Sequence, residues 1–339
     1  MNKNAFINKH NFLQFIILLA ALNFVVTGCN NSNKNYELIS NTDTVTSSTT
    51  SFASPSDIDT LSTDGNKMMN TIEKITLTTR PIGSQEEKTV CEYLRLQLEA
   101  FGYKTKIQEF PYILQSLKLK NTPFGNGDAK FFDFNIGKPD GTSQNLIAIK
   151  NPTTPGSNDI IIVSAHYDTT NHSTGAIDNA SGVAVLMEVA RNIVNFPSNI
   201  EVRFLLFSGE ENYLYGSRYY VNKLTEDERK HIIADINLDC IGEEGANKAI
   251  LGTRNGKETD VSKLFADYNM HIKKGPSSDQ LSFWKAGIPA LTITQYPVMD
   301  QNGKDLPDEI FRINKAKLKV VSDIVSKVLL NTMCSTSPE

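Results

Sequence analysis

A continuous run of β-branched residues near the middle of the chain, Ile160–Val163, places the strongest constraint on the fold. Such a run is typical of a strand that is covered on both faces in a parallel sheet. The run leads into polar residues, with His166 and Asp168 separated by a single position. Open α/β sheets bind their ligands at the carboxyl ends of the strands. The stretch therefore predicts a buried central strand that delivers an imidazole and a carboxylate to a functional site.

Two further apolar stretches end in the same way. Residues 201–207 are apolar at nearly every position and lead into the pair Glu210 and Glu211. Residues 232–238 lead directly into Asp239. Several carboxylates and one imidazole at one sheet edge would repel one another without a cation. Nitrogen and carboxylate oxygen ligands suit zinc, so the sequence predicts a zinc site at this edge.

Helical patterns alternate with these strands along the chain. Apolar residues recur at helical spacing over residues 90–101, 183–194 and 318–328, and Gly102 is a natural end for the first of these helices. We also expect a helix over residues 261–270. Helices that alternate with apolar strands predict an α/β fold, with a mostly parallel central sheet and helices on both faces.

The first 28 residues have the layout of a secretory signal. Lys3 and Lys9 precede an apolar run over residues 12–26, and the segment Val-Thr-Gly-Cys that ends at Cys29 resembles a lipobox. A lipobox directs lipid attachment to the cysteine and cleavage before it. The alternative is an uncleaved signal anchor, but a spanning helix needs ~20 apolar residues and this run is short. We expect an exported lipoprotein that is anchored to a membrane through lipid on Cys29.

The rest of the chain divides into a tether and one domain. Residues 29–65 are rich in Ser, Thr, Asn and Asp and cannot bury a core, so we expect a flexible tether. Residues 66–335 have a length that suits one α/β domain. Removal of the signal changes the formal net charge from −4 to about −6. The chain has no basic cluster of the kind that nucleic acid requires, so no nucleic-acid partner is expected.

The four cysteines fit export from the cell. If Cys29 carries lipid, three cysteines remain, which permits at most one disulfide within the chain. Cys240 lies beside Asp239 on a predicted buried strand and is interpreted as a small core residue. Cys91 and Cys334 are the pair that could form a disulfide.

Four short segments come in the order and spacing of a known family. They are residues 166–168 (His-Tyr-Asp), 175–182 (Gly-Ala-Ile-Asp-Asn-Ala-Ser-Gly), 207–211 (Phe-Ser-Gly-Glu-Glu) and 237–239 (Asn-Leu-Asp). Over residues 68–330 the chain resembles the co-catalytic zinc aminopeptidases of the aminopeptidase Y and bacterial leucyl aminopeptidase type. The resemblance implies a zinc metallopeptidase that hydrolyses peptides from their free N-terminus.

The resemblance also implies a set of metal ligands. Two metal ions in such peptidases lie ~3.5–4 Å apart and share one bridging ligand. Asp178 matches the bridging residue of the family, and a carboxylate can bridge two ions because it has two oxygens. His166 and Asp239 would complete the first metal site, and Glu211 would bind the second ion.

Two more residues match catalytic positions of the family. Glu210 would act as the general base, and Asp168 would orient His166 and fix its tautomer. A turn cap is the alternative role for Asp168. A solvated loop is the alternative for the two adjacent glutamates, but Gly209 and the apolar strand before them argue against it.

The chain departs from the family pattern in three places. Residues 211–214 read Glu-Asn-Tyr-Leu where many relatives have a glycine, which would alter the rim of the site. Residues 278–280 read Ser-Asp-Gln where the third residue is usually histidine. The stretch 299–308, where the family has its late histidine ligand, contains no histidine. Asp300 and Asp305 are the candidate replacements, so we expect one tightly bound ion and a second, weaker one.

Two other functions stay open. A glutaminyl cyclase resembles this family and keeps a single zinc, but it relies on the late histidine that is missing here. The second alternative is a non-catalytic binding lipoprotein with a degraded second metal site. The presence of Glu210 argues against a binding module, because such a module has no need for a general base.

Overall fold

The computed structural model describes residues 61–114 and 138–334. The predicted signal, Cys29 and residues 29–60 of the predicted tether lie outside these residues, as does the predicted end of the domain at residue 335. Among the residues that the structure describes, no helix is both long enough and apolar enough to cross a membrane.

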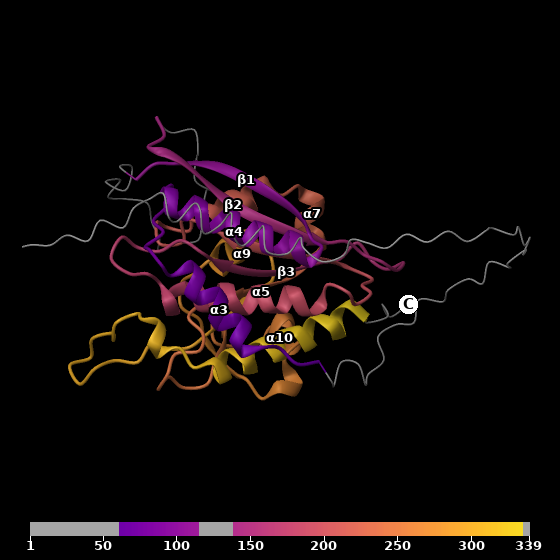
Figure 1. Cartoon of the computed structure of the whole chain (residues 1–339). Coiled ribbons are helices and arrows are strands. Elements are labelled where there is room, and N and C mark those ends of the chain that lie inside the picture. The colour runs from indigo at the N-terminus through magenta and orange to yellow at the C-terminus, as the bar shows by residue number, and fades with distance from the viewer. Residues whose placement is uncertain (1–60, 115–137, 335–339) are drawn as a thin grey trace, which may run out of the picture. The chain divides into compact units, whose positions relative to one another are not determined.

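A mixed eight-stranded sheet forms the centre of the described domain (Figure 1), with the strand order β1-β2-β4-β3-β5-β8-β6-β7. The central pairs β4/β3, β3/β5 and β5/β8 are parallel. The pairs β1/β2, β2/β4 and β6/β8 are antiparallel, and β6/β7 is parallel. The strands are β1 (Lys104–Tyr112), β2 (Gly141–Lys150), β3 (Ile160–His166), β4 (Glu201–Phe207), β5 (Ile232–Leu238), β6 (Ile250–Thr253), β7 (His271–Lys274) and β8 (Ala290–Thr294). The predicted α/β class is confirmed.

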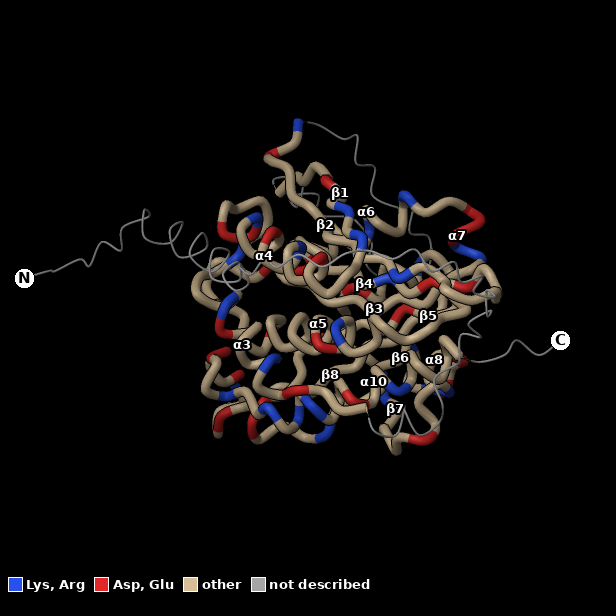
Figure 2. The backbone as a smooth tube through the Cα atoms, turned by 45° about the vertical axis from the view of Figure 1, so that its right-hand side comes forward, with Lys and Arg blue, Asp and Glu red and all other residues tan. Residues whose placement is uncertain are grey.

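Helices cover both faces of this sheet, and in Figure 2 strands β4, β3 and β5 run between α5 and α10 on one side and α6 and α7 on the other. Alternate side chains of β3 explain why: Ile161 and Val163 pack into one buried cluster, and Ile160 and Ile162 pack into another. The helical elements are α3 (Gly65–Ile75), α4 (Gln85–Phe101), η2 (Ala176–Ser181), α5 (Gly182–Ile193), α6 (Tyr215–Lys223), α7 (Glu226–His231), α8 (Asp260–Lys263), η3 (Ala266–Tyr268), α9 (Gln280–Lys285), η4 (Ile310–Arg312) and α10 (Lys315–Cys334).

The predicted helix over residues 261–270 is wrong. The chain forms only the short helix α8 and, after a break, the single turn η3. Asn269 then adopts a left-handed conformation with φ of 48°, which asparagine tolerates better than most residues. This residue ends the turn and lets the following residues pair as β7 with β6. The edge strand β7 therefore begins just after the region of the helical pattern, at His271.

The disulfide between Cys91 and Cys334 is not formed. Both residues are free thiols, as is Cys240. Cys91 is buried in α4, and this burial raises the pKa of its thiol to about 12. The Cys91 side chain is therefore a neutral, unreactive core group at neutral pH.

Candidate metal centre and active site

The carboxyl ends of three neighbouring strands meet at one edge of the sheet. His166 is the last residue of β3, and Asp239 directly follows β5. Glu210 follows β4 after a tight turn at Gly209, where φ is 75°. Because β3 pairs in parallel with both β4 and β5, these three side chains are delivered to the same place.

Asp178 comes from a turn rather than from a strand. Asp178 and Asn179 have non-helical backbone angles inside η2, and the peptide bond between them is cis. Asn179 attaches this turn to the end of β5: Nδ2 donates to the carbonyl of Leu238 (2.8 Å), and Oδ1 accepts from the N–H of Cys240 (3.2 Å). A Cβ on Gly182 would lie 2.4 Å from the carbonyl oxygen of Leu238, so glycine is required for this close approach.

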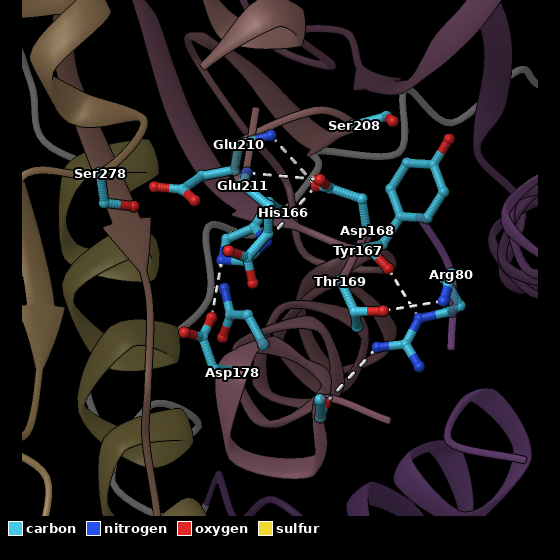
Figure 3. Close-up of polar contacts among 12 residues, drawn as sticks. Arg80, His166, Tyr167, Asp168, Thr169, Asp178, Ser208, Glu210, Glu211 and Ser278 are labelled. Atoms are coloured by element: carbon cyan, nitrogen blue, oxygen red, sulfur yellow. Dashed lines mark hydrogen bonds and ion pairs between the residues drawn. The ribbon is translucent and has the colours of Figure 1, made fainter. Parts of the chain in front are cut away.

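Three of the predicted metal ligands lie close together. His166 Nε2 is 3.1 Å from Asp178 Oδ1 (Figure 3) and 3.6 Å from Asp239 Oδ1. The three ligand atoms all lie within 4.8 Å of one another. Two ligands ~2.1 Å from a tetrahedral ion are about 3.4 Å apart. The observed separations therefore fit three ligands of one zinc ion.

Three polar atoms of this group are buried without a hydrogen-bond partner among the described residues. In the described part of the chain, no hydrogen-bond partner is found for either ring nitrogen of His166 or for Oδ1 of Asp239. Unpaired polar atoms are costly to bury. Burial opposes a charged imidazole, yet the surrounding carboxylates, Asp168 and Asp178 foremost, raise the pKa of His166 well above its usual value. Both features fit a cation held between these side chains.

Asp168 lies on the other side of the His166 ring. Its Oδ1 is 3.5 Å from Nδ1 of His166, and the side chain is fully buried. Asp168 also accepts hydrogen bonds from the backbone N–H groups of Glu210 (3.2 Å) and Glu211 (3.4 Å) (Figure 3). This is the place that an orienting residue for His166 would occupy. The catalytic role of Asp168 stays a prediction.

The two adjacent glutamates have different surroundings. Burial raises the pKa of Glu210 well above its usual value, and Asp279 adds to this effect while His166 opposes it. Burial together with Asp178 raises the pKa of Glu211 to about 7. Glu211 does not join the group of three close ligand atoms. The assignment of Glu210 as base and Glu211 as ligand of a second ion stays a prediction.

Asp300 and Asp305 lie in a turn of their own. Asp300 accepts hydrogen bonds from the backbone N–H groups of Asn302 (2.8 Å) and Lys304 (2.9 Å). Asp305 is exposed and forms an isolated bridge with Met299. Neither carboxylate joins the three close ligand atoms.

Two residues without an assigned role also reach the site. Although burial opposes the effect, contacts with His166 and with the hydroxyl of Ser278 lower the pKa of Asp239. Asn237 in turn donates a hydrogen bond to Ser278 Oγ (3.0 Å). The carboxylate of Asp308 accepts a hydrogen bond from the backbone N–H of Asp178. The motif at 278–280 and the segment 237–239 had marked Ser278 and Asn237, whereas the carboxylates predicted from the stretch 299–308 were Asp300 and Asp305, not Asp308.

Comparisons with known proteins agree with this geometry. Residues 145–329 match the profile of peptidase family M28. Aminopeptidase YwaD of Bacillus subtilis (strain 168) is 35% identical over 199 residues, which cover 55% of this chain and 44% of that protein. The chain thus spans less than half the length of this relative.

Solved structures match over a larger share of the chain. An aminopeptidase from Aneurinibacillus sp. strain AM-1 superposes with a TM-score of 0.68 at 25% identity, covering 82% of this chain and 97% of that one. A glutaminyl cyclase of Porphyromonas gingivalis superposes with a TM-score of 0.61 at 21% identity, covering 79% and 98%. The second likeness shows a shared fold only.

Proposed function

Because this chain belongs to peptidase family M28, whose profile matches residues 145–329, we propose that it is a zinc-dependent aminopeptidase. Its substrates would be peptides with a free N-terminus. The observation that carries this proposal is the group of His166, Asp178 and Asp239, with ligand atoms within 4.8 Å of one another beside Glu210.

His166, Asp178 and Asp239 would hold the zinc ion. When bound, zinc supplies a Lewis acid that polarises the scissile carbonyl and makes water a better nucleophile at neutral pH. Asp168, 3.5 Å from Nδ1 of His166, would keep the ring oriented with Nε2 toward the ion. A second, weaker ion would use Glu211, with Asp300 or Asp305 as a further ligand after movement of their turn.

Glu210 would be the general base. Its backbone N–H is tied to Asp168, which also faces His166, so the glutamate and the ligand histidine share one support. Glu210 would take a proton from the attacking water and return it to the leaving amine. General-base work of this kind is worth ~10²–10⁴ in rate.

The proposal is tested by the activity of the purified protein on aminoacyl peptides and on the same peptides with a blocked N-terminus, with and without added zinc. We expect hydrolysis of unblocked peptides only, and a higher rate after zinc addition. A peptide that begins with glutamine tests the cyclase alternative, because cyclisation removes the free amine without cleaving the chain. A protein that neither binds zinc nor turns over any peptide would support the binding-module alternative.

We further propose that the protein is exported and anchored to a membrane through lipid on Cys29. The charged start, the apolar run over residues 12–26 and the lipobox-like segment support this location. Cys29→Ala should release the protein from membranes or leave the precursor uncleaved. Unchanged membrane association together with normal cleavage before residue 29 would contradict it.

A further inference from the structure

The three close ligands differ in what holds them. The side chain of His166 is 1% exposed and that of Asp239 is 12% exposed, whereas that of Asp178 is 48% exposed. His166 and Asp239 lie at the ends of buried strands, so the sheet fixes their positions. Asp178 lies at the end of residues 173–178, which we call the ligand loop. Asn179 attaches the C-terminal side of this residue to the end of β5, so on its N-terminal side the position of Asp178 depends on what binds the ligand loop.

The carboxylate of Asp308 binds the donor groups of the ligand loop. Oδ1 accepts from the backbone N–H of Ile177 (2.5 Å). Oδ2 accepts from the backbone N–H of Asp178 (3.2 Å) and from the hydroxyl of Ser173 (3.1 Å). One carboxylate therefore contacts both ends of the loop, including the peptide group of the metal ligand itself.

The guanidinium of Arg80 binds the acceptor groups of the same loop. Arg80 is fully buried, and its Nη1 donates to the carbonyl of Thr174 (2.7 Å) while Nη2 approaches the carbonyl of Gly175 (3.5 Å). Nε also donates to the carbonyl of Tyr167 (2.7 Å) (Figure 3). A further bond from Nη1 to the carbonyl of Ile75 (2.6 Å) fixes the guanidinium. The loop is thus attached to the end of α3 and to the residue that follows His166.

Charge and shape both favour this arrangement. Burial lowers the pKa of Arg80 to about 10, with Asp168, Asp308 and Asp178 acting in the opposite direction, so the side chain stays cationic at neutral pH. Gly175 has φ of +61°, and a Cβ there would lie 2.3 Å from the carbonyl oxygen of Asp178 and 3.1 Å from Arg80 Nη2. The loop can close over the guanidinium only with glycine at this position.

We propose that Asp308 and Arg80 are positioning residues that clamp the ligand loop from its N–H side and its carbonyl side, and so hold Asp178 in place for the metal ion. The link to the metal rests on the proposed function. The clamp itself concerns the loop and can be tested without metal.

The first test measures zinc affinity by competition with a chromophoric chelator. Asp308→Ala should weaken zinc binding about 10–100-fold, the range for residues that orient a metal ligand. Asp308→Asn keeps one acceptor oxygen and should recover part of the affinity. Asp323→Ala is a matched control. Asp323, on α10, also accepts hydrogen bonds from a backbone N–H and a hydroxyl, but both belong to Thr63 rather than to the ligand loop. This control should keep wild-type affinity.

The second test measures amide hydrogen exchange of residues 173–178 in the metal-free protein. Asp308→Ala should speed exchange at Ile177 and Asp178, and Arg80→Lys, which keeps the charge but not the fork, should loosen the same segment. Unchanged exchange in Asp308→Ala would overturn the clamp. Faster exchange with unchanged zinc affinity would overturn its role toward the metal ligand. If the wild-type protein binds no zinc and cleaves no peptide, the proposed function fails, and exchange alone decides the clamp.

Discussion

The two halves of the candidate metal centre are built differently. His166, Asp178 and Asp239 form the first half, with ligand atoms within 4.8 Å of one another. The proposed second half consists of Glu211 and the turn that carries Asp300 and Asp305, and none of these carboxylates joins that group. The first half is supported by parallel strands and a clamped loop, whereas Asp300 bonds to backbone groups of its own turn.

This difference has a thermodynamic consequence. Ligands that the fold already holds in place lose little conformational entropy when an ion binds, whereas mobile or distant ligands must first be ordered. The first half should therefore bind one ion tightly. Binding of an ion to the second half requires Glu211 or the 299–305 turn to move and become ordered, which costs free energy. Its ion should therefore bind more weakly.

The largest expected effect comes from Glu210, the proposed general base. Glu210→Gln should keep the fold and the tight ion while lowering kcat/KM on unblocked peptides by ~10²–10⁴, because the amide cannot accept the proton from water. Metal content and steady-state rates measure the two properties separately. Glu211→Gln serves as the comparison, since its defect should be relieved by excess zinc. Normal turnover by Glu210→Gln would mean that the base is misassigned.

An intermediate effect is expected from Glu87, which lies beneath the loop that carries both glutamates. Its buried carboxylate accepts hydrogen bonds from Ser143, from Ser208 and from the N–H of Gly83. Burial raises the pKa of Glu87 from 4.5 to about 7, despite these bonds. Between these two pH values the folded protein binds more protons than the unfolded chain, so stability falls as pH rises.

The glutamine of the Glu87→Gln variant cannot ionise, so this variant should not lose stability in this way as pH rises. Relative to wild type, its free energy of unfolding should increase between pH 5 and pH 8, by up to about 3 kcal/mol at 1.4 kcal/mol per pKa unit. Urea unfolding of the two metal-free proteins at both pH values measures the difference. Zinc affinity of the first half should not change. A difference in stability that is the same at pH 5 and pH 8 would show that Glu87 ionises normally.

The smallest expected effect separates the two halves directly. Zinc titration of the wild-type protein should show two unequal affinities. Asp300→Ala or Asp305→Ala should weaken only the second ion, by about tenfold. Asp239→Asn should weaken the first ion instead. Two equally tight ions that neither change in the 299–305 turn affects would refute the division into halves.

The sequence determined the α/β fold and the strands that lead to the site. Ile160–Val163 and the apolar runs that become β4 and β5 are local patterns, and parallel strands bring their carboxyl ends to one edge. Four short segments in register were enough to predict the family, and the match over residues 145–329 confirms it. The predicted helix over 261–270 is wrong because the chain breaks after α8 and Asn269 adopts a left-handed conformation before β7, which pairs with β6.

Only the tertiary structure decided which residues support the site. Arg80 and Asp308 lie far from Asp178 in the chain, and each binds backbone groups of the ligand loop. Backbone groups are the same for every residue type, so such contacts leave no pattern of residue types in the sequence. Among the neighbouring carboxylates, Asp308 contacts the Asp178 turn, whereas Asp300 bonds within its own turn. Which carboxylate makes this contact depends on how the 299–308 segment lies against the Asp178 turn, and no local sequence pattern encodes that.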